Sequence, residues 1–390
     1  MEHLEKKIKS IFTIIVMCVL AILSVWNLPV FESVAKEKIN ENSENSVKNI
    51  VTNIENRFRE NVKYHNQLVN VYGIYQKAIG HTIVGNFEYV ADKKGVLHMI
   101  NNYTPYDTET FLDGMEKLKT CTDEKGIPMF FVQAPNREIA NEEDAIKDFN
   151  LDDETMDTIT AALRNKGISV LDLREKLLTE GRSFELSDLY FHTDLHMQTD
   201  AEIWMLQQVV EYLESEYNIE IKDKKYLTDM SYFTKKSYEF LGNYGRTYGE
   251  YFVKSDMFDI YHPNFETSYN FVAVGDESAA KSGTFEDVVM NGYENSEYGK
   301  YTYWVTDYMQ FMRPVYSYIN NYQDDVKLLF VTDSIAYRGI AQLSLATSKI
   351  TIADPRFFGE TDYLKNALEE QYDAVIVIQG NFMLGVPLIM

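Results

Sequence analysis

An aspartate and a histidine two residues apart are the side chains of this sequence best suited to acid–base chemistry. Asp194 and His196 lie in the segment 190–196, just before a stretch that is typical of a helix. A carboxylate beside an imidazole can fix the tautomer of the ring and stabilise its protonated form, as in a nucleophilic triad. The spacing therefore predicts a general base at His196 that is oriented by Asp194.

A serine that could complete the triad follows a predicted strand much later in the chain. The predicted strand 327–331, with apolar residues at 328–331, leads directly into Thr332-Asp333-Ser334, which places Ser334 at the carboxyl edge of that strand. Open α/β sheets bind their ligands at this edge. We therefore expect the side chains of Asp194, His196 and Ser334 to converge there within hydrogen-bond reach.

A metal site is the alternative interpretation of the same segment. His192, Asp194 and His196 offer two imidazoles and a carboxylate, which suit zinc or iron. Three ligands so close together in one loop are difficult to arrange around one ion, and the sequence has no Glu-x-x-His motif. It also lacks a Gly-rich phosphate loop and a dinucleotide fingerprint. We therefore expect neither a metal nor another cofactor.

Alternating helical and strand patterns predict the sheet that must position these residues. Helices are expected at 111–120 and 152–166, and buried strands at 127–133, 168–171, 327–331, 350–352 and 373–378. Thr199-Asp200-Ala201-Glu202 is typical of a capping box and predicts a helix from there to about residue 217. The expected fold class is α/β with a central, mainly parallel sheet.

The amino-terminal segment is predicted to direct export. Residues 11–31 are 21 residues without a charge, and a helix of that length spans about 30 Å, the thickness of a bilayer core. Lysines ahead of it predict that residues 1–10 form a cytoplasmic tail and that the remaining chain is extracytoplasmic. We favour an uncleaved single-pass anchor in the cell membrane. A cleaved signal peptide, with a site at Ser33-Val34-Ala35, and a buried helix are the alternatives.

Residues 32–70 are predicted to form a linker and an amphipathic helix. The stretch 36–46 is polar and charged, and apolar residues then recur every three or four positions up to Leu68. This periodicity is typical of a helix with one apolar face. A stalk or a helix packed on the main domain is the favoured interpretation, and a partner-binding helix is the alternative. Residues 71–390 are expected to form the main domain.

Tyrosine is concentrated at residues 226–322, where the regular pattern fades. Sixteen of the 28 tyrosines lie there, and we interpret the stretch as an insertion or extended lid. A tyrosine ring can stack on a sugar while its hydroxyl bonds the sugar oxygens, whereas ordinary core tyrosines are the alternative. The candidate substrate-binding residues are Tyr244, Tyr248 and Tyr251, with Arg246 as a hydrogen-bond donor.

Composition and charge exclude several classes of protein. The 390 residues are 45% hydrophobic, with 19 glycines and 8 prolines, which is typical of a packed globular chain. The net charge of −23 makes a nucleic-acid partner unexpected and favours a neutral or amino-bearing glycan over a polyuronate. The two cysteines, Cys18 and Cys121, predict no intrachain disulfide.

The motifs together resemble the DHHW proteins, which are grouped with the alginate O-acetylation proteins AlgX and AlgJ in a branch of the SGNH hydrolase-like superfamily. The resemblance rests on Thr193-Asp194-Leu195-His196-Met197 before a helix and on Val331-Thr332-Asp333-Ser334 after a strand. Blocks at 54–61, 132–137, 240–246, 354–358 and 372–378 agree with it. The resemblance implies a three-layer αβα fold for the exported chain.

The same resemblance implies an O-acyltransferase or esterase, with acetyl as the expected group. Such a protein works in the envelope with a multi-spanning membrane-bound O-acyltransferase to decorate an exopolysaccharide or cell-wall glycan. Ser334 would be the nucleophile, His196 the base and Asp194 its orienter. The backbone N–H of Ser334, together with Gly242 or Asn243, would stabilise the oxyanion.

Two residues depart from the family signature. Leu195 and Met197 stand where the DHHW pattern has its first histidine and its tryptophan. Leu195 is compatible with activity if the second histidine is the base. Met197 changes the packing around His196 and therefore favours the alternative function, a catalytically weakened envelope scaffold or polysaccharide-binding protein that partners a membrane-bound O-acyltransferase.

Overall fold

The computed structural model divides the chain into two compact units, Met1–Gln76 and Lys77–Met390. The residues that it describes are 14, 17–19, 21–33, 62–84, 89–100, 108–137, 152–179, 184–290, 313–359, 361–378, 380 and 388.

The first unit contains helical residues at 21–33 and most of α3 (His65–Ala78). Asn27 is buried, and its side-chain oxygen accepts a hydrogen bond from the Lys63 N–H at 2.7 Å. No helix in the described part of the chain combines the length and apolarity needed to span a bilayer. The predicted tail 1–10, part of the predicted anchor 11–31, the linker 36–46 and most of the predicted amphipathic helix lie outside the described residues.

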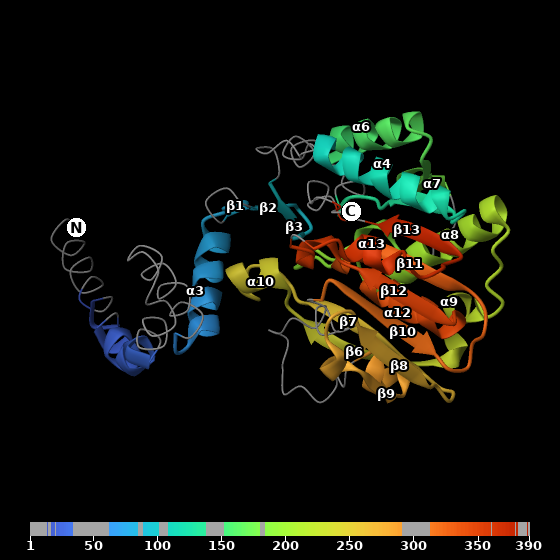
Figure 1. The fold of residues 1–390 in the computed structure, drawn as a ribbon. Helices are drawn as coiled ribbons and strands as arrows, with labels where there is room; N and C mark the ends of the chain where they lie inside the picture. Colours follow the sequence, from blue (N-terminus) through green and yellow to red (C-terminus); the bar gives the residue numbers. More distant parts are fainter. Residues whose placement is uncertain are drawn as a thin grey trace. The chain divides into compact units, whose positions relative to one another are not determined.

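A central eight-stranded sheet organises the second unit (Figure 1). Five strands are mutually parallel in the order β5-β4-β13-β11-β12, and β10, β8 and β9 extend the sheet with antiparallel pairing. The predicted mainly parallel sheet is therefore confirmed. The strands are β4 (Met129–Gln133), β5 (Ser169–Asp172), β8 (Tyr269–Ala273), β9 (Lys281–Gly283), β10 (Val315–Asn320), β11 (Lys327–Thr332), β12 (Lys349–Ala353) and β13 (Ala374–Ile378).

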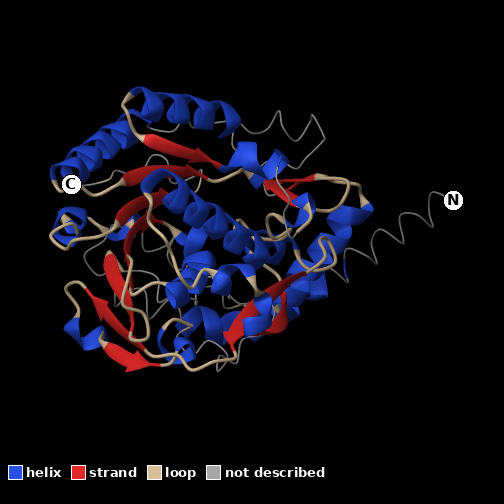
Figure 2. Ribbon diagram, turned by 90° about the vertical axis from the view of Figure 1, so that its right-hand side faces the viewer, coloured by secondary structure: helices blue, strands red, loops and turns tan. Residues whose placement is uncertain are grey.

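Helices cover both faces of this sheet (Figure 2). Successive side chains of a strand point to opposite faces, so in β13 the residues Ala374, Ile376 and Ile378 join one core while Val375 and Val377 join the other. The first core packs against α8 (Thr199–Tyr217) and α12 (Tyr337–Leu343), with the shorter α7 (Leu173–Thr179) and α9 (Lys225–Thr228). The second packs against α4 (Thr108–Glu124), α6 (Asp152–Asn165) and α13 (Tyr363–Ala367). This arrangement is the expected three-layer αβα fold.

The tyrosine-rich stretch is not one continuous insertion. Its strands β8 and β10 are part of the central sheet, whereas β6 (Phe233–Phe240) and β7 (Asp256–Pro263) form a separate two-stranded ribbon with α10 (Asn243–Tyr248) between them. Tyr269, Tyr316 and Tyr318 are fully buried in the first core. Smaller elements are α11 (Phe285–Val288) and the sheet of β1 (Ile83–Val84), β2 (Tyr89–Ala91) and β3 (Leu97–Met99).

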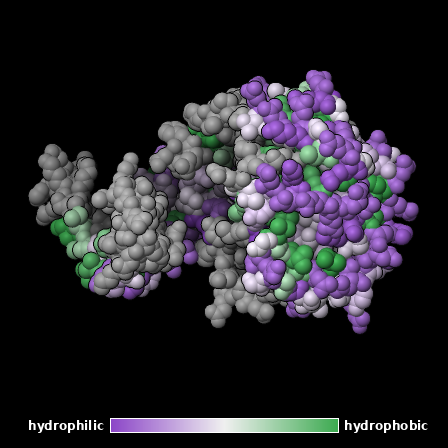
Figure 3. All heavy atoms as spheres, viewed as in Figure 1, coloured by the Kyte–Doolittle hydropathy of each residue, from purple (hydrophilic) through white to green (hydrophobic). Residues whose placement is uncertain are grey.

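Hydrophilic side chains cover most of the described surface that faces the viewer in Figure 3 on the second unit. This surface agrees with the large negative net charge of the chain. Most of the buried apolar side chains of the unit are in the two cores on either side of the sheet, and a smaller cluster lies around Leu241.

The start of α8 differs from the sequence prediction. Gln198 is the N-cap residue and makes no side-chain cap hydrogen bond, while the Thr199 hydroxyl donates to the Asp259 carbonyl at 2.8 Å. The Glu202 carboxylate is paired with Arg338 of α12 instead of reaching back to its own helix. The predicted capping box is therefore wrong, because a buried tertiary ion pair takes the acidic side chain that the local motif requires.

Helices α8 and α12 pack closely at Gly339. A Cβ added there would lie 2.6 Å from the Glu202 carbonyl oxygen and 2.6 Å from Leu206 Cδ2. Real side chains do not tolerate such contacts with backbone, so only glycine fits without moving one helix. Since α12 follows Ser334 and α8 follows His196 in sequence, this contact sets the spacing of the two segments that carry the candidate triad.

The close contact at Gly339 predicts whether Gly339→Ala raises or lowers the free energy of unfolding. In an exposed helix, alanine stabilises relative to glycine by about 1 kcal/mol. For Gly339→Ala we expect the clash to reverse this sign and to lower the free energy of unfolding by about 1–3 kcal/mol. Urea unfolding followed by circular dichroism measures the change, with Ser215→Ala on the exposed side of α8 as a control that stays within about 0.5 kcal/mol. Equal or greater stability of Gly339→Ala would contradict the close packing.

Candidate active site

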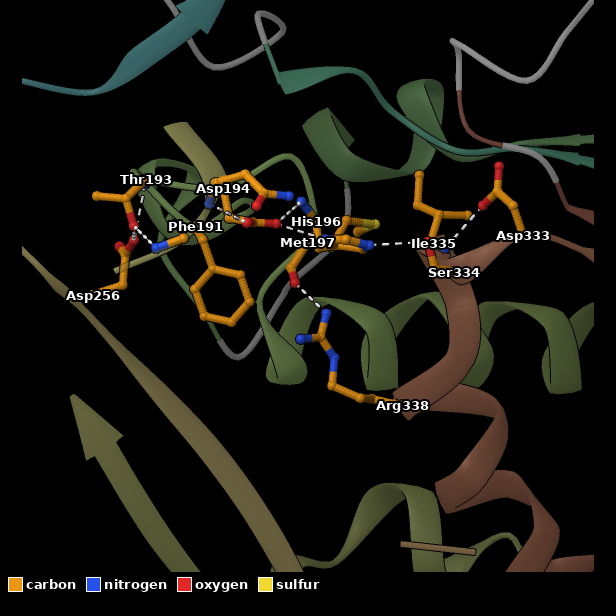
Figure 4. A network of polar contacts seen from close by, with 12 residues as sticks. Phe191, Thr193, Asp194, His196, Met197, Asp256, Asp333, Ser334, Ile335 and Arg338 are labelled. Carbon is orange, nitrogen blue, oxygen red and sulfur yellow. Dashed lines mark hydrogen bonds and ion pairs between the residues drawn. The ribbon is translucent and has the colours of Figure 1, made fainter. Parts of the chain in front are cut away.

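The three side chains of the candidate triad meet at the carboxyl edge of the sheet (Figure 4). Ser334 begins a short 3-10 turn directly after β11, and Asp194 and His196 belong to the loop before α8. The distance from His196 Nε2 to Ser334 Oγ is 2.9 Å, and that from His196 Nδ1 to Asp194 Oδ1 is 2.6 Å. The predicted convergence is confirmed, and the geometry allows the serine proton to pass to the imidazole.

The carboxyl group of Asp194 is buried but ionised. Burial disfavours its charged form, yet the charge and hydrogen bond of His196, together with the N–H of Asn243, outweigh this effect and lower its pKa. Only 3% of Asp194 and 5% of His196 are exposed, so the pair is shielded from water. A carboxylate in this position can stabilise the imidazolium that forms when His196 accepts a proton.

The two ends of the loop that carries Asp194 and His196 are bonded to each other as in an antiparallel pair of strands. Tyr190 and Met197 form an isolated antiparallel bridge, and the Phe191 N–H donates to the His196 carbonyl at 3.1 Å. The Gln198 N–H donates to the Leu189 carbonyl at 3.0 Å. These bonds fix the ends of the loop, but its tip needs partners from other segments.

Asp256, the first residue of β7, supplies part of the support at the tip. Its carboxylate accepts hydrogen bonds from the N–H of His192 at 2.9 Å, from the N–H of Thr193 at 2.9 Å and from the Thr193 hydroxyl at 2.6 Å. Burial raises the pKa of Asp256, while these donors and the nearby His192 oppose the rise. Sequence reasoning missed this residue, because nothing local marks an aspartate 62 positions after Asp194 as its support.

The start of α10 supplies the rest of this support. The Gly242 N–H donates to the Thr193 hydroxyl at 3.0 Å, and the Asn243 N–H donates to Asp194 Oδ2 at 2.8 Å. The next two N–H groups of α10 both donate to the Thr193 carbonyl at 3.0 Å. The backbone N–H groups of Gly242 and Asn243, two of the predicted oxyanion donors, are therefore already bonded to the loop of the candidate triad. A role of the Asn243 side chain at the oxyanion stays a prediction.

Two of the three candidate sugar-binding tyrosines are core residues. Tyr244 is 6% exposed and Tyr248 is 1% exposed, and both pack in a small apolar cluster with Leu241. The Tyr244 ring also lies 4.7 Å from the Tyr89 ring, centroid to centroid. The prediction that these two rings stack on a sugar is wrong, since they anchor α10 to its surroundings. Tyr251 is 56% exposed, and its role stays a prediction.

Two arginines differ in what they contact near the site. The candidate donor Arg246 is bonded to the side chain of Asn243. Arg137, which follows β4, donates to the carbonyls of Leu97 at 2.7 Å and Phe191 at 2.6 Å and also bonds the Asp194 carbonyl. Arg137 belongs to the block 132–137 that carries the family resemblance, but its fixing of the loop was not predicted.

The segment around Ser334 is fixed by the neighbouring Asp333. Its carboxylate accepts the N–H of Ile335 at 2.8 Å and that of Gly380 at 2.9 Å, which ties the turn after β11 to the chain beyond β13. On the opposite side, Met197 is fully buried and its carbonyl accepts a hydrogen bond from Arg338 (Figure 4). Met197 is thus a packed core residue next to His196.

The alternative metal interpretation finds no support in the geometry. In the described ranges, no three His, Cys, Asp or Glu side chains are grouped so that they could hold an ion. His192 contacts the Ser187 carbonyl at 3.1 Å through Nε2, and its Nδ1 lies 3.9 Å from Asp256. The contacts of His196 are instead with Asp194 and Ser334.

The fold is similar to those of several solved structures. Bacillus cereus PatB1 with a sulfonyl adduct superposes with a TM-score of 0.58 at 16% identity, covering 76% of this chain and 94% of that one. A DHHW family protein from Eubacterium siraeum gives a TM-score of 0.54 at 14% identity, covering 76% and 91% of the two chains. The O-acetyltransferase domain of Pseudomonas putida AlgJ aligns more loosely, with a TM-score of 0.42 at 10% identity over 76% and 92%.

The similarities to PatB1 and to the DHHW family protein concern the fold alone. The resemblance to DHHW proteins that the motifs predicted is confirmed at the level of the fold, by PatB1 and the DHHW family protein. No family model matches the sequence, and no curated protein matches it either. The chemistry of the site therefore has to be argued from its own residues.

The close contact between α10 and the loop predicts the effect of Gly242→Ala. An added Cβ would lie 2.3 Å from Asp194 Cβ and 2.6 Å from the Thr193 carbonyl oxygen, so Asp194 must move away from His196. Since a displacement of about 1 Å can cost on the order of 100-fold in rate, we expect labelling of Ser334 by a sulfonyl fluoride to slow by a similar factor. Intact-mass spectrometry measures the labelling rate.

The matched control is Thr247→Ala, on the exposed side of the same helix. We expect this variant to be labelled at the wild-type rate, because Thr247 bonds only the Asn243 carbonyl of its own helix. Wild-type labelling of a folded Gly242→Ala protein would show that the position of Asp194 does not govern the reactivity of Ser334.

Proposed function

We propose that the protein is an extracytoplasmic O-acyltransferase or esterase that acts on a glycan through Ser334, His196 and Asp194, with acetyl as the transferred group. The hydrogen-bonded chain of 2.6 Å and 2.9 Å between these side chains is the observation that carries the proposal. A serine hydroxyl is a weak nucleophile unless a base lies within reach of its proton. Fold similarity to PatB1, whose structure contains a sulfonyl adduct, and to a DHHW family protein supports the proposal.

The first half of the proposed reaction forms an acyl-serine. Ser334 Oγ attacks the carbonyl carbon of the acyl donor while its proton passes to His196 Nε2. Asp194 holds the Nδ1–H of the ring and stabilises the resulting imidazolium. The tetrahedral intermediate then expels the donor oxygen, which takes the proton from His196 Nε2 as the bond between carbon and oxygen breaks.

The second half transfers the acyl group. A sugar hydroxyl attacks the acyl carbon and gives its proton to His196 Nε2, and the proton then returns to Ser334 Oγ as the acyl-serine bond breaks. Water in place of the sugar makes the same sequence a hydrolysis. One site therefore serves both a transferase and an esterase, and access of the glycan decides between them.

The proposed oxyanion donor is the backbone N–H of Ser334. Ser334 is the first residue of its 3-10 turn, and the first N–H groups of a helical turn have no acceptor within the turn. The backbone N–H groups of Gly242 and Asn243 are not part of this proposal, since they bond Thr193 and Asp194. A donor so close to the nucleophile is suited to the negative charge that develops on the carbonyl oxygen.

The substrate, location and partner are extensions of this proposal. The uncharged run 11–31 behind several lysines supports an anchor in the cell membrane, and the family resemblance supports a multi-spanning O-acyltransferase as partner. The net charge of −23 favours a neutral or amino-bearing glycan. Tyr251 is the proposed stacking residue, because its ring is exposed whereas those of Tyr244 and Tyr248 are buried.

An inactive scaffold is the less favoured function. That alternative rested on Met197, which stands where the family has tryptophan. The observation that favours an enzyme is the set of hydrogen bonds that hold the loop, from Asp256, from Arg137 and from Arg338 to the Met197 carbonyl. An inactive protein would not need a serine held at hydrogen-bond distance from a buried histidine.

The direct test is hydrolysis of a small acetyl ester such as 4-nitrophenyl acetate by Ser334→Ala. We expect turnover to fall by several orders of magnitude, because the acyl-serine can no longer form. Initial rates of ester cleavage measure the change, and circular dichroism checks that the variant is folded.

Ser215→Ala is the matched control for this test. Ser215 is an exposed serine of α8, and we expect its loss to leave turnover unchanged. An equal rate in Ser334→Ala and wild type would remove Ser334 from the mechanism. Wild-type protein that neither hydrolyses the ester nor reacts with a sulfonyl fluoride would favour the scaffold function instead.

A further inference from the structure

A buried ion pair lies next to the candidate triad and takes no part in the proposed chemistry. Arg338 of α12 and Glu202 of α8 form a salt bridge with side chains that are 1% and 0% exposed. Glu202 follows His196 by six residues, and Arg338 follows Ser334 by four. The pair therefore joins the segment that carries the base to the segment that carries the nucleophile.

Glu202 also binds the backbone of α12. One oxygen of its carboxylate, Oε2, accepts the N–H of Arg338 at 2.8 Å and the N–H of Gly339 at 3.2 Å. These N–H groups belong to the first turn of α12 and have no acceptor inside that helix. Together with the close approach at Gly339, these bonds fix the start of α12 against α8.

Arg338 in turn holds the loop of His196. Its Nη2 donates to the Glu202 carboxylate. The same nitrogen donates to the carbonyl of Met197, the residue directly after His196 (Figure 4). Its guanidinium lies over the Phe191 ring at 5.3 Å and over the Phe258 ring at 5.4 Å. One side chain of α12 thus contacts the loop of the base at two places.

Stability alone does not account for such a pair. Replacing a buried ion pair by apolar residues of similar size is often neutral or stabilising, because desolvation of the charges is costly. Burial indeed raises the pKa of Glu202, and the charge and hydrogen bond of Arg338 oppose this rise. The pair joins the segment of Ser334 to the segment of His196, and this position points to a role in the site.

We infer that Glu202 and Arg338 are positioning residues for the proposed reaction, on which this inference rests. They hold His196 Nε2 within reach of Ser334 Oγ, and their opposite charges compensate each other beside the loop of His196. Among the described residues, the charged groups around His196 include Asp194 on its own loop, Glu202 on α8 and Arg338 on α12, while Arg137 bonds the Asp194 carbonyl.

Glu202→Gln tests the charge of the pair. The variant leaves the Arg338 guanidinium uncompensated next to His196, because arginine does not lose its proton. A like charge disfavours imidazolium, so we expect the acid limb of kcat/KM against pH to move down by about one pH unit. Glu202→Gln/Arg338→Met removes both charges, and we expect its acid limb to return to the wild-type position.

The double variant distinguishes the effect of the uncompensated Arg338 charge from the effect of losing the hydrogen bond that positions the loop of His196. It lacks the hydrogen bond to the Met197 carbonyl, so we expect its plateau rate to stay at least about ten-fold below wild type although its acid limb is restored. Glu211→Gln, on the exposed side of α8, is the matched control and should change neither quantity. A purely structural pair would lower stability in Glu202→Gln without moving the acid limb.

A readout independent of turnover distinguishes failure of this inference from failure of the proposed function. The His196 resonance of protein labelled with [13Cε1]-histidine, assigned through His196→Gln, is titrated in wild type, Glu202→Gln and the double variant. A downward shift in Glu202→Gln that the double variant reverses supports the inference even if no ester is cleaved. Identical titrations in all three proteins overturn it, even if wild type is an active esterase.

A further variant keeps the test decisive if Glu202→Gln does not fold. Glu202→Asp retains the charge but withdraws the carboxylate from the N–H groups of α12. We expect a plateau rate at least about ten-fold lower with an unmoved acid limb. The labelling rate of Ser334 by a sulfonyl fluoride provides the same comparison without a substrate, and a wild-type rate in Glu202→Asp would refute the positioning role.

Discussion

The hydrogen bond between His196 and Ser334 joins two segments that no secondary structure connects, and contacts from several described parts of the chain support it. Ser334 stands at the end of a buried parallel strand, so the sheet fixes its position. His196 lies in a loop whose backbone has only one short antiparallel bridge at its ends, so the other backbone groups need partners elsewhere. Asp256, Arg137, Arg338 and the first N–H groups of α10 supply partners to this loop, and each comes from a different part of the chain.

This requirement explains why the ribbon β6–β7 and helix α10 are present beside the central sheet. Asp256 opens β7 and α10 follows β6, so the ribbon delivers both supports to the same loop. Tyr244 and Tyr248 are buried because they fasten α10, which must aim its N–H groups at Thr193 and Asp194. Tyr244 and Tyr248, which the tyrosine content of the segment predicts as sugar-binding residues, therefore contribute to the rigidity of α10 instead. Catalytic geometry of this kind is sensitive to small displacements.

The sequence predicts the elements whose pattern is local and misses the contacts that are not. Strands β11 and β13 contain the apolar runs 328–331 and 374–378, which mark them in the sequence. The spacing of Asp194 and His196 marks that pair without further context. The Thr199 to Glu202 motif misleads because a buried arginine from α12 takes the glutamate, a competition that local rules do not include. Asp256 has no local signal at all, because its partners come from a loop 63 and 64 positions away. Burial likewise separates Tyr248 from Tyr251, which tyrosine density treats alike.

Charge balance is the remaining constraint on this site. Proton transfer to His196 creates a cation in a region that water reaches poorly, where Coulomb interactions are stronger than in solution. Asp194 balances that cation and is held ionised by the same imidazole and by the Asn243 N–H. A second charge close by would shift this balance unless it were neutralised, and Glu202 with Arg338 forms such a neutral unit. The positive charge that forms on His196 is therefore stabilised by the fixed carboxylate of Asp194. Little reorganisation of the site then accompanies the proton transfer.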